Sequence, residues 1–112
     1  MQDATRQVYV EDSVREYVVR LTRATRQHTD VVIGASPRGS LALFRAGQAL
    51  AALRGRDYVL PDDIKYIAIP VLSHRLILRP ESQLRGVAHE NVIQELLQST
   101  AVKFEQIDDE AQ

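Results

Sequence analysis

The sequence has 112 residues, of which 45% are hydrophobic, and it carries a formal net charge of -1. These values suit one small globular domain and exclude the strong positive charge that draws a protein toward nucleic acid. The chain has no cysteine, which excludes a disulfide framework and a thiolate metal site, and no apolar run reaches the ~20 residues that a membrane-spanning helix needs.

Two helices are predicted in the first half of the chain. Residues 1–7 are polar and are expected to be disordered, and Val8–Val10 is expected to be a short extended piece. A helix is predicted over Asp12–Gln27, because its apolar residues recur at the i, i+3, i+4, i+7 spacing of one helical face. Residues 28–33 are predicted to connect it to a second helix over Pro37–Arg54.

The middle of the chain predicts a short extended piece and then a third helix. Arg56–Leu60 is expected to pair with Val8–Val10 as a minimal two-stranded ribbon. The third helix begins at Pro61, because proline suits the first helical position. Pro70 interrupts the helical pattern, so the helix is expected to break or kink near Ala68–Ile69.

The last third of the chain predicts a loop, one more helix and a tail. Residues 80–87 are expected to form the loop, and a helix is predicted over His89–Thr100. Residues 104–112 are acidic and are expected to be disordered. The sum is a small all-α domain over residues 8–103, a helical bundle of four to five helices.

The stretch from Gly34 to Ser40 contains the strongest candidate site. Ser36 is a good N-cap residue and Pro37 a good first residue of a helix. Arg38 then lies in the first turn, where the helix dipole is already positive and an acid would be the usual choice. No Asp or Glu lies between Gly34 and Arg56 to neutralise it. The pattern indicates an anion site suited to phosphate, and the alternative is an ordinary capped helix whose arginine points into water.

Several kinds of chemistry are missing from the sequence. There is no cysteine, and nothing brings one of the three histidines near a serine as a nucleophile–base pair. No Gly-Lys dipeptide occurs, so the phosphate-binding loop of P-loop enzymes is absent, and so is an apolar run ending in Asp-Glu that could hold Mg²⁺. If the chain binds a nucleotide, it does so as an accessory, and by itself it is not expected to hydrolyse ATP.

Taken in order, the motifs resemble the C-terminal lid of MoxR-type AAA+ ATPases. The resemblance covers about Val8–Arg79 and depends on segments in the family's order and spacing: Arg26-x-His28, Gly34-Ala35-Ser36-Pro37-Arg38, Gly55-Arg56-Asp57-Tyr58-Val59-x-Pro61-x-Asp63-Ile64 and Val71-Leu72-x-His74-Arg75. In that family the lid is a helical bundle that follows a P-loop domain carrying Walker A, Walker B and the arginine finger. Since this chain has no P-loop, the resemblance implies that it is a part of a longer ATPase.

The resemblance also implies roles for four residues. Arg38 matches the sensor 2 arginine, which reaches the β- and γ-phosphates of ATP bound between the large domain and the lid of the same subunit. That role is catalytic only in the full-length protein, together with ATP and Mg²⁺. Ser36 and Pro37 would fix the helix start that aims Arg38, and Gly34 would let the backbone turn close to the nucleotide. No tightly bound cofactor is expected on this chain alone.

Expected partners follow from the same resemblance. They are the P-loop domain of the same chain, neighbouring subunits of a ring that is commonly a hexamer, and proteins with von Willebrand factor A domains. The family is thought to act in a chaperone-like way in maturing or metallating other proteins, which implies the cytoplasm of a bacterium or archaeon. His74 and Arg75 match the family pattern but are assigned to packing or to the surface between domains.

Two other classes of protein stay open as alternatives. A helical nucleic-acid-binding module is suggested by the five arginines between Arg6 and Arg26, although the net charge of -1 opposes it. A protein-interaction module of histone-fold type is suggested by Val59–Ile64, which opens a helix as in such proteins. That class needs a long central helix, whereas the second predicted helix stops at Gly55.

Overall fold

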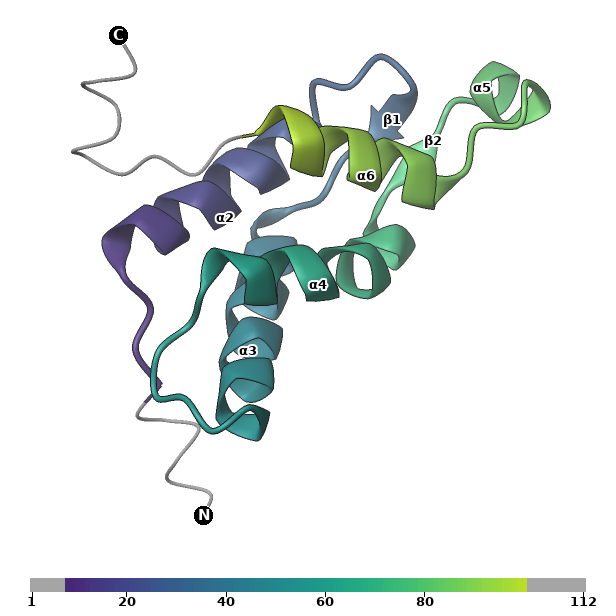
Figure 1. Ribbon diagram of the computed structural model, residues 1–112. Helices are drawn as coiled ribbons and strands as arrows, with labels where there is room; N and C mark the ends of the chain where they lie inside the picture. The colour runs from purple at the N-terminus through teal and green to yellow at the C-terminus, as the bar shows by residue number, and fades with distance from the viewer. Residues whose placement is uncertain (1–7, 101–112) are drawn as a thin grey trace, which may run out of the picture.

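The computed structural model describes residues 8–100 and is mostly helical (Figure 1). Within that range the order of elements is α2 (Asp12–Thr25), β1 (Val31–Ile33), α3 (Pro37–Leu53), α4 (Pro61–Leu72), the 3₁₀ turn η1 (Ser73–Arg75), β2 (Ile77–Leu78), α5 (Pro80–Leu84) and α6 (His89–Ser99). The prediction of a small helical bundle is therefore confirmed. The predicted tail at residues 104–112 and the segment 1–7 lie outside the described residues.

The core lies among α2, α3, α4 and α6, in which α2 and α4 contact each other and both of the other helices. Each helix contributes an apolar stripe, and the largest fully buried apolar side chains include Tyr17, Leu21, Leu43, Ile64 and Ile93. Burying a side chain of this size stabilises the fold by roughly 1.5–3 kcal/mol. Figure 1 shows α3 crossing behind α4, with the small sheet and α5 extending to one side of the bundle.

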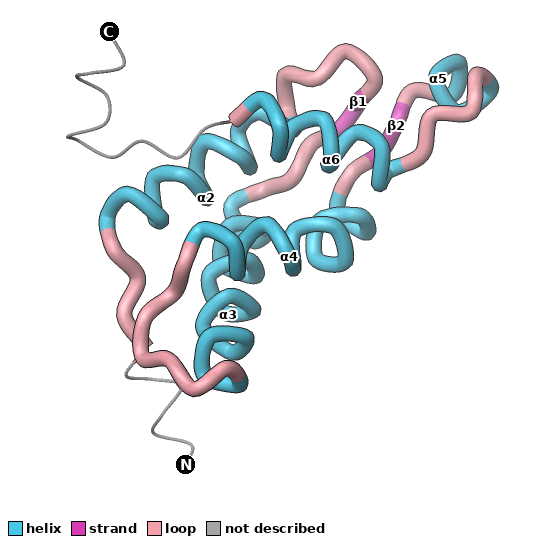
Figure 2. Tube along the Cα trace, viewed as in Figure 1, coloured by secondary structure: helices cyan, strands magenta, loops and turns pink. Residues whose placement is uncertain are grey.

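The two-stranded sheet lies elsewhere than predicted. β1 pairs antiparallel with β2, with Val31 opposite Leu78 and Ile33 opposite Ile77 (Figure 2). The predicted ribbon between Val8–Val10 and Arg56–Leu60 is reduced to one parallel bridge, in which Tyr9 N donates to Asp57 O at 2.8 Å and Val59 N donates to Tyr9 O at 2.9 Å. Strands of two or three residues are too short to show the alternation by which a strand is recognised in sequence.

Two predictions of helix boundaries were wrong. The division into two short helices near Ala68–Ile69 does not occur: α4 continues through Pro70 and ends at Leu72, directly before the 3₁₀ turn η1, while the alternative of a kink in one helix stays a prediction. Pro70 lies in the last turn of α4, where its missing N–H removes one hydrogen bond to the carbonyl four residues earlier, and the helix continues despite that loss. The loop predicted at 80–87 contains the short helix α5, which begins at Pro80.

A buried carboxylate closes the start of α4. Asp63 has no exposed surface; its carboxylate accepts from Arg56 Nη1 and Nη2 at 2.7 and 2.8 Å and from the backbone N–H of Leu60 at 2.8 Å. Burial alone would raise the pKa of Asp63, but the hydrogen bonds from Arg56 and Leu60 and the charges of Arg56 and Arg54 outweigh it and lower the pKa. Asp63 therefore caps α4 as an ionised group.

Candidate functional site

The start of α3 is built as the sequence predicts. Ser36 is the N-cap residue, and its hydroxyl accepts a hydrogen bond from Arg38 N at 3.2 Å, while Pro37 is the first helical residue. Gly39 N donates to Ser36 O at 2.8 Å and closes the first turn. Arg38 is exposed, so the helix start presents its side chain to the outside of the domain.

Ala35, the residue before the Ser36 cap, is held in place by residues at the end of α2. Ala35 is fully buried; its N–H donates to Thr25 Oγ1 at 2.9 Å, and its carbonyl accepts from Arg26 Nη1 at 2.7 Å. Thr25 Oγ1 in turn donates to Thr22 O within α2 at 2.6 Å, and Ser40 Oγ donates to Thr22 Oγ1 at 2.9 Å, which ties α2 to the first turn of α3. We call Thr22, Thr25, Arg26 and Ser40 the α2 clamp, and it sets where α3 begins.

Sequence reasoning does not identify the α2 clamp as part of the site. In the sequence Thr25 is only one residue of a helical face, and Arg26 is only part of a family motif. The signal that could have found the clamp is the pair Thr22 and Thr25, two hydroxyls on the otherwise apolar face of α2. Each of these hydroxyls donates to a carbonyl within α2, and its free lone pair accepts from the segment that packs against the helix.

Gly34 is required by packing inside the domain. A Cβ at this position would lie 2.6 Å from Arg26 Cγ and 2.7 Å from both Arg26 Cα and Arg26 N. The φ angle of Gly34 is not positive, so the need for glycine is steric and not conformational. The predicted proximity of Gly34 to a nucleotide stays a prediction, and the contact with Arg26 is a sufficient reason for the glycine without it.

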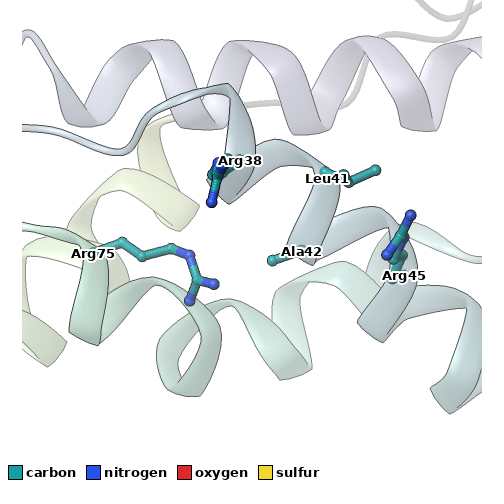
Figure 3. Close-up of a pocket in the computed structure, with 5 residues that line it drawn as sticks. All are labelled: Arg38, Leu41, Ala42, Arg45 and Arg75. Carbon is teal, nitrogen blue, oxygen red and sulfur yellow. The ribbon is translucent and has the colours of Figure 1, made fainter.

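Arg38 lines a surface pocket of about 480 Å³ (Figure 3). The other lining residues are Leu41, Ala42 and Arg45 from α3 and Arg75 from η1. Three of these five side chains are guanidinium groups, and within residues 8–100 none of the three forms an ion pair with a carboxylate. The pocket is therefore positively charged and open to an anionic ligand.

The distribution of acids explains why the pocket has no counter-ion of its own. The sequence has no Asp or Glu from Val31 to Arg56, and none from Ile64 to Pro80. These two stretches contain all of β1, α3, η1 and β2, and all of α4 beyond Asp63. The walls of the pocket come from this acid-free part of the chain.

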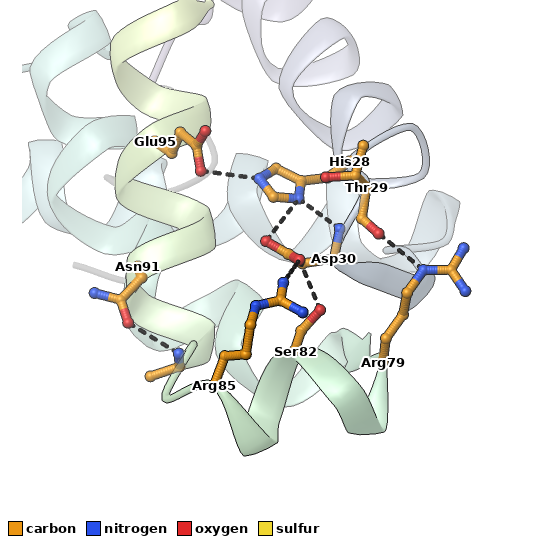
Figure 4. A network of polar contacts seen from close by, with 9 residues as sticks. His28, Thr29, Asp30, Arg79, Ser82, Arg85, Asn91 and Glu95 are labelled. Carbon is orange, nitrogen blue, oxygen red and sulfur yellow. Dashed lines mark hydrogen bonds and ion pairs between the residues drawn. The ribbon is translucent and has the colours of Figure 1, made fainter.

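A second polar cluster has a structural role (Figure 4). His28 Nδ1 accepts from Asp30 N at 3.0 Å, so His28 Nε2 carries the hydrogen of the neutral ring and donates to Glu95 Oε1 at 3.0 Å. Asp30 Oδ1 accepts from Ser82 Oγ at 2.6 Å and from Arg85 Nη2 at 3.3 Å. These contacts connect the α2–β1 turn to α5 and α6, and every member already has a partner.

The structure thus assigns each predicted site residue a place. Arg38 lines the pocket, and Ser36 and Pro37 form the helix start that carries it. Gly34 packs against Arg26, the residue that follows α2. Arg75, which the sequence indicated only for packing or a domain surface, lines the same pocket as Arg38. His74 is exposed in η1 and does not line the pocket.

Residues 23–96 match the AAA lid domain family. The match covers more than half of the chain, so the chain belongs to this family of helical lids. The crystal structure of a candidate ATPase from Cytophaga hutchinsonii superposes on 91% of this chain with a TM-score of 0.86 and 30% sequence identity, and the match covers 34% of that chain.

The similar sequences narrow the class to the MoxR type. The chain is 36% identical over 111 residues to Chaperone MoxR1 of Mycobacterium tuberculosis, a match that covers 91% of this chain and 29% of that protein. It is 44% identical over 102 residues to the uncharacterized protein YeaC of Bacillus subtilis, a match that covers 91% of this chain and 32% of that protein. The chain is the lid domain of a MoxR-type AAA+ ATPase, and it spans about a third of the length of these relatives.

The match places the chain in neither of the alternative classes. Residues 23–96 match a lid family, and α3 ends at Leu53, ahead of Gly55 with a φ of 79°, so the helix is not the long central helix of a histone fold. No helix among the described residues is long and apolar enough to span a membrane.

The residues of the pocket fit a phosphate group and not a metal ion. Guanidinium groups pair with phosphate oxygens through two parallel hydrogen bonds, and three of them face one pocket here. The described residues contain no group of three or more His, Asp or Glu side chains that could hold a metal.

Proposed function

We propose that this domain is the nucleotide-sensing lid of its ATPase, and that Arg38 contacts the β- and γ-phosphates of ATP held by a P-loop domain of the same chain. The single observation that supports this role most is the position of Arg38. It is an exposed guanidinium without an acidic partner among residues 8–100, and it lines a pocket at a firmly held helix start.

The chemistry of the arginine suits the role. ATP with Mg²⁺ supplies the phosphoryl group that is transferred. The guanidinium of Arg38 would donate hydrogen bonds to oxygens on which negative charge grows as the phosphoryl group is transferred, and this lowers the barrier. Ser36 and Pro37 would keep the first turn of α3 in place, so that little reorganisation is needed when Arg38 engages.

The same contact would convert nucleotide state into movement. Arg38 belongs to the lid and its proposed ligand to another domain, so the contact favours one angle between the two. Loss of the γ-phosphate removes part of the contact and releases that angle. We further propose that the parent protein forms an AAA+ ring, commonly a hexamer, in the cytoplasm. There it would act on client proteins in a chaperone-like way, with von Willebrand factor A domain proteins as partners.

The test is Arg38→Ala in the full-length ATPase. We expect ATP turnover to fall by about 10²-fold, the range seen when one charge-stabilising donor is removed from an active site. The thermal unfolding of the 112-residue chain should not change, because Arg38 is exposed. Arg23→Ala, which removes another exposed arginine outside the pocket, is the matched control and should leave turnover unchanged. Undiminished hydrolysis in Arg38→Ala would refute the sensor role.

A further inference from the structure

The pocket around Arg38 contains a second arginine that is held in position. Arg75 lies in η1, and its Nη1 donates to Val71 O at 2.9 Å, which uses one of its five N–H donors. Figure 3 shows Arg38 and Arg75 reaching toward the same space, one from α3 and the other from η1. Arg75 makes no other side-chain hydrogen bond to the described residues, so its remaining donors are available to a ligand.

Arg75 packs next to Gly39 in the first turn of α3. A Cβ at Gly39 would lie 3.0 Å from Ala35 Cβ, 3.6 Å from Arg75 Cδ and 3.7 Å from Leu72 Cδ2. The aliphatic part of Arg75 therefore passes close to the first turn of α3, directly after Arg38. A Cβ at position 39 would crowd Ala35, whereas it would meet Arg75 only at an ordinary van der Waals distance.

The two charges do not neutralise each other, and the protein does not neutralise them. Like charges that share a pocket repel, and no described carboxylate within ion-pair distance offsets the repulsion. Arg45 adds a third positive charge two helical turns from Arg38, roughly 10 Å along the axis of α3. A ligand with several negative charges along its length fits this arrangement better than a single carboxylate does.

We propose that Arg75 is a second phosphate-binding residue, which together with Arg38 clamps the polyphosphate chain of the nucleotide. The proposal rests on the proposed function, since it assigns both arginines to one ligand. It goes beyond that function because Arg75 lies in η1, which follows α4. The two arginines can therefore bind one ligand only when α3 and η1 are correctly packed. The competing explanation is that Arg75 only caps the C-terminal carbonyls of α4.

The experiment is a titration of the 112-residue chain with inorganic tripolyphosphate, followed by NMR chemical shifts at physiological ionic strength. We expect saturable shifts around Ser36–Gly39 and Arg75. The substitutions Arg75→Gln and Arg38→Gln should each weaken binding about fivefold, which is ~1 kcal/mol. Arg23→Gln removes one positive charge outside the pocket and should leave the affinity unchanged. Thermal unfolding of each variant separates a binding effect from a loss of the cap on α4.

Each outcome decides a different point. If Arg38→Gln weakens binding and Arg75→Gln does not, the second contact is refuted and the sensor role of Arg38 stands. If only Arg75→Gln weakens binding, the sensor role fails. The absence of any saturable shift refutes the proposal that Arg38 and Arg75 bind one polyphosphate chain together. Citrate, which has three carboxylates, is the chemical control: if it binds as tightly as tripolyphosphate, the pocket recognises acidic groups in general and the phosphate assignment is overturned.

Discussion

Replacing Gly34 with alanine should destabilise the domain strongly through one methyl group. The new Cβ would lie 2.6 to 2.7 Å from three atoms of Arg26, two of which belong to the backbone. Carbon atoms in contact are usually about 3.5 Å apart or more, so the shortfall is roughly 0.8 Å. A side chain could rotate away, but the backbone at the end of α2 cannot.

The segment around Gly34 has no free direction in which to move. Ala35, the next residue, is bonded to Thr25 and Arg26 through its N–H and its carbonyl, so moving it away from α2 breaks both hydrogen bonds. Overpacking in a tight site costs about 1–3 kcal/mol, and the upper end applies here. For a domain of this size we expect a fall in Tm of roughly 10–20 °C, measured by circular dichroism.

A second glycine provides the matched control. Gly55 has a φ of 79°, and a Cβ added there would meet nothing within 4 Å, so Gly55→Ala costs only the strain of a left-handed residue, about 1–2 kcal/mol. The reasoning predicts the larger loss at Gly34, where φ is ordinary and space is lacking. A Tm of Gly34→Ala within a few degrees of wild type, or a larger loss in Gly55→Ala, would refute it.

Two further predictions concern buried polar groups. Thr25→Val keeps the shape of the side chain but leaves the buried N–H of Ala35 without its acceptor. The free energy of unfolding, measured in urea, should therefore fall by about 1–3 kcal/mol. Thr29→Val, at an exposed position, is the control and should change it little. Because the pKa of Asp63 is lowered in the folded state, its contribution to stability is complete at neutral pH and is lost as the pH falls below the ordinary value of 3.8. Asp63→Asn should therefore destabilise the domain by at least ~1 kcal/mol at neutral pH, the value of a helix cap. The difference from wild type should shrink in acid, and a difference that is independent of pH would contradict the ionised cap.

The parts of the fold that sequence predicts are those encoded locally. The start of α3 follows from Ser36 and Pro37, whose capping geometry needs no other part of the chain. The lengths of α2 and α6 follow from the spacing of apolar residues on one face. Arg38 stands out in the sequence because it breaks a local rule, as a positive charge in the first turn of a helix.

The parts that sequence misses depend on contacts between distant segments. Pairing of β1 with β2 joins residues more than forty positions apart, and each strand is too short to carry a pattern. The place of Arg75 in the pocket depends on where α4 ends relative to α3, which no local preference determines. The helix α4 continues through Pro70 to the buried Leu72, so packing in the core outweighs the one hydrogen bond that the proline removes.

At Arg38 the backbone is held by hydrogen bonds, whereas the side chain is left available to a ligand. The α2 clamp and the Ser36 cap hold residues 35–38, whereas no hydrogen bond from the guanidinium of Arg38 occurs within the part of the chain that the structure describes. A ligand that binds this arginine has to order only the side chain, at a cost of about 2 kcal/mol or less. If the backbone were loose, the added cost of ordering it could exceed what one exposed guanidinium contributes. The α2 clamp would therefore support the proposed contact of Arg38 with phosphate, although none of its four residues lines the pocket.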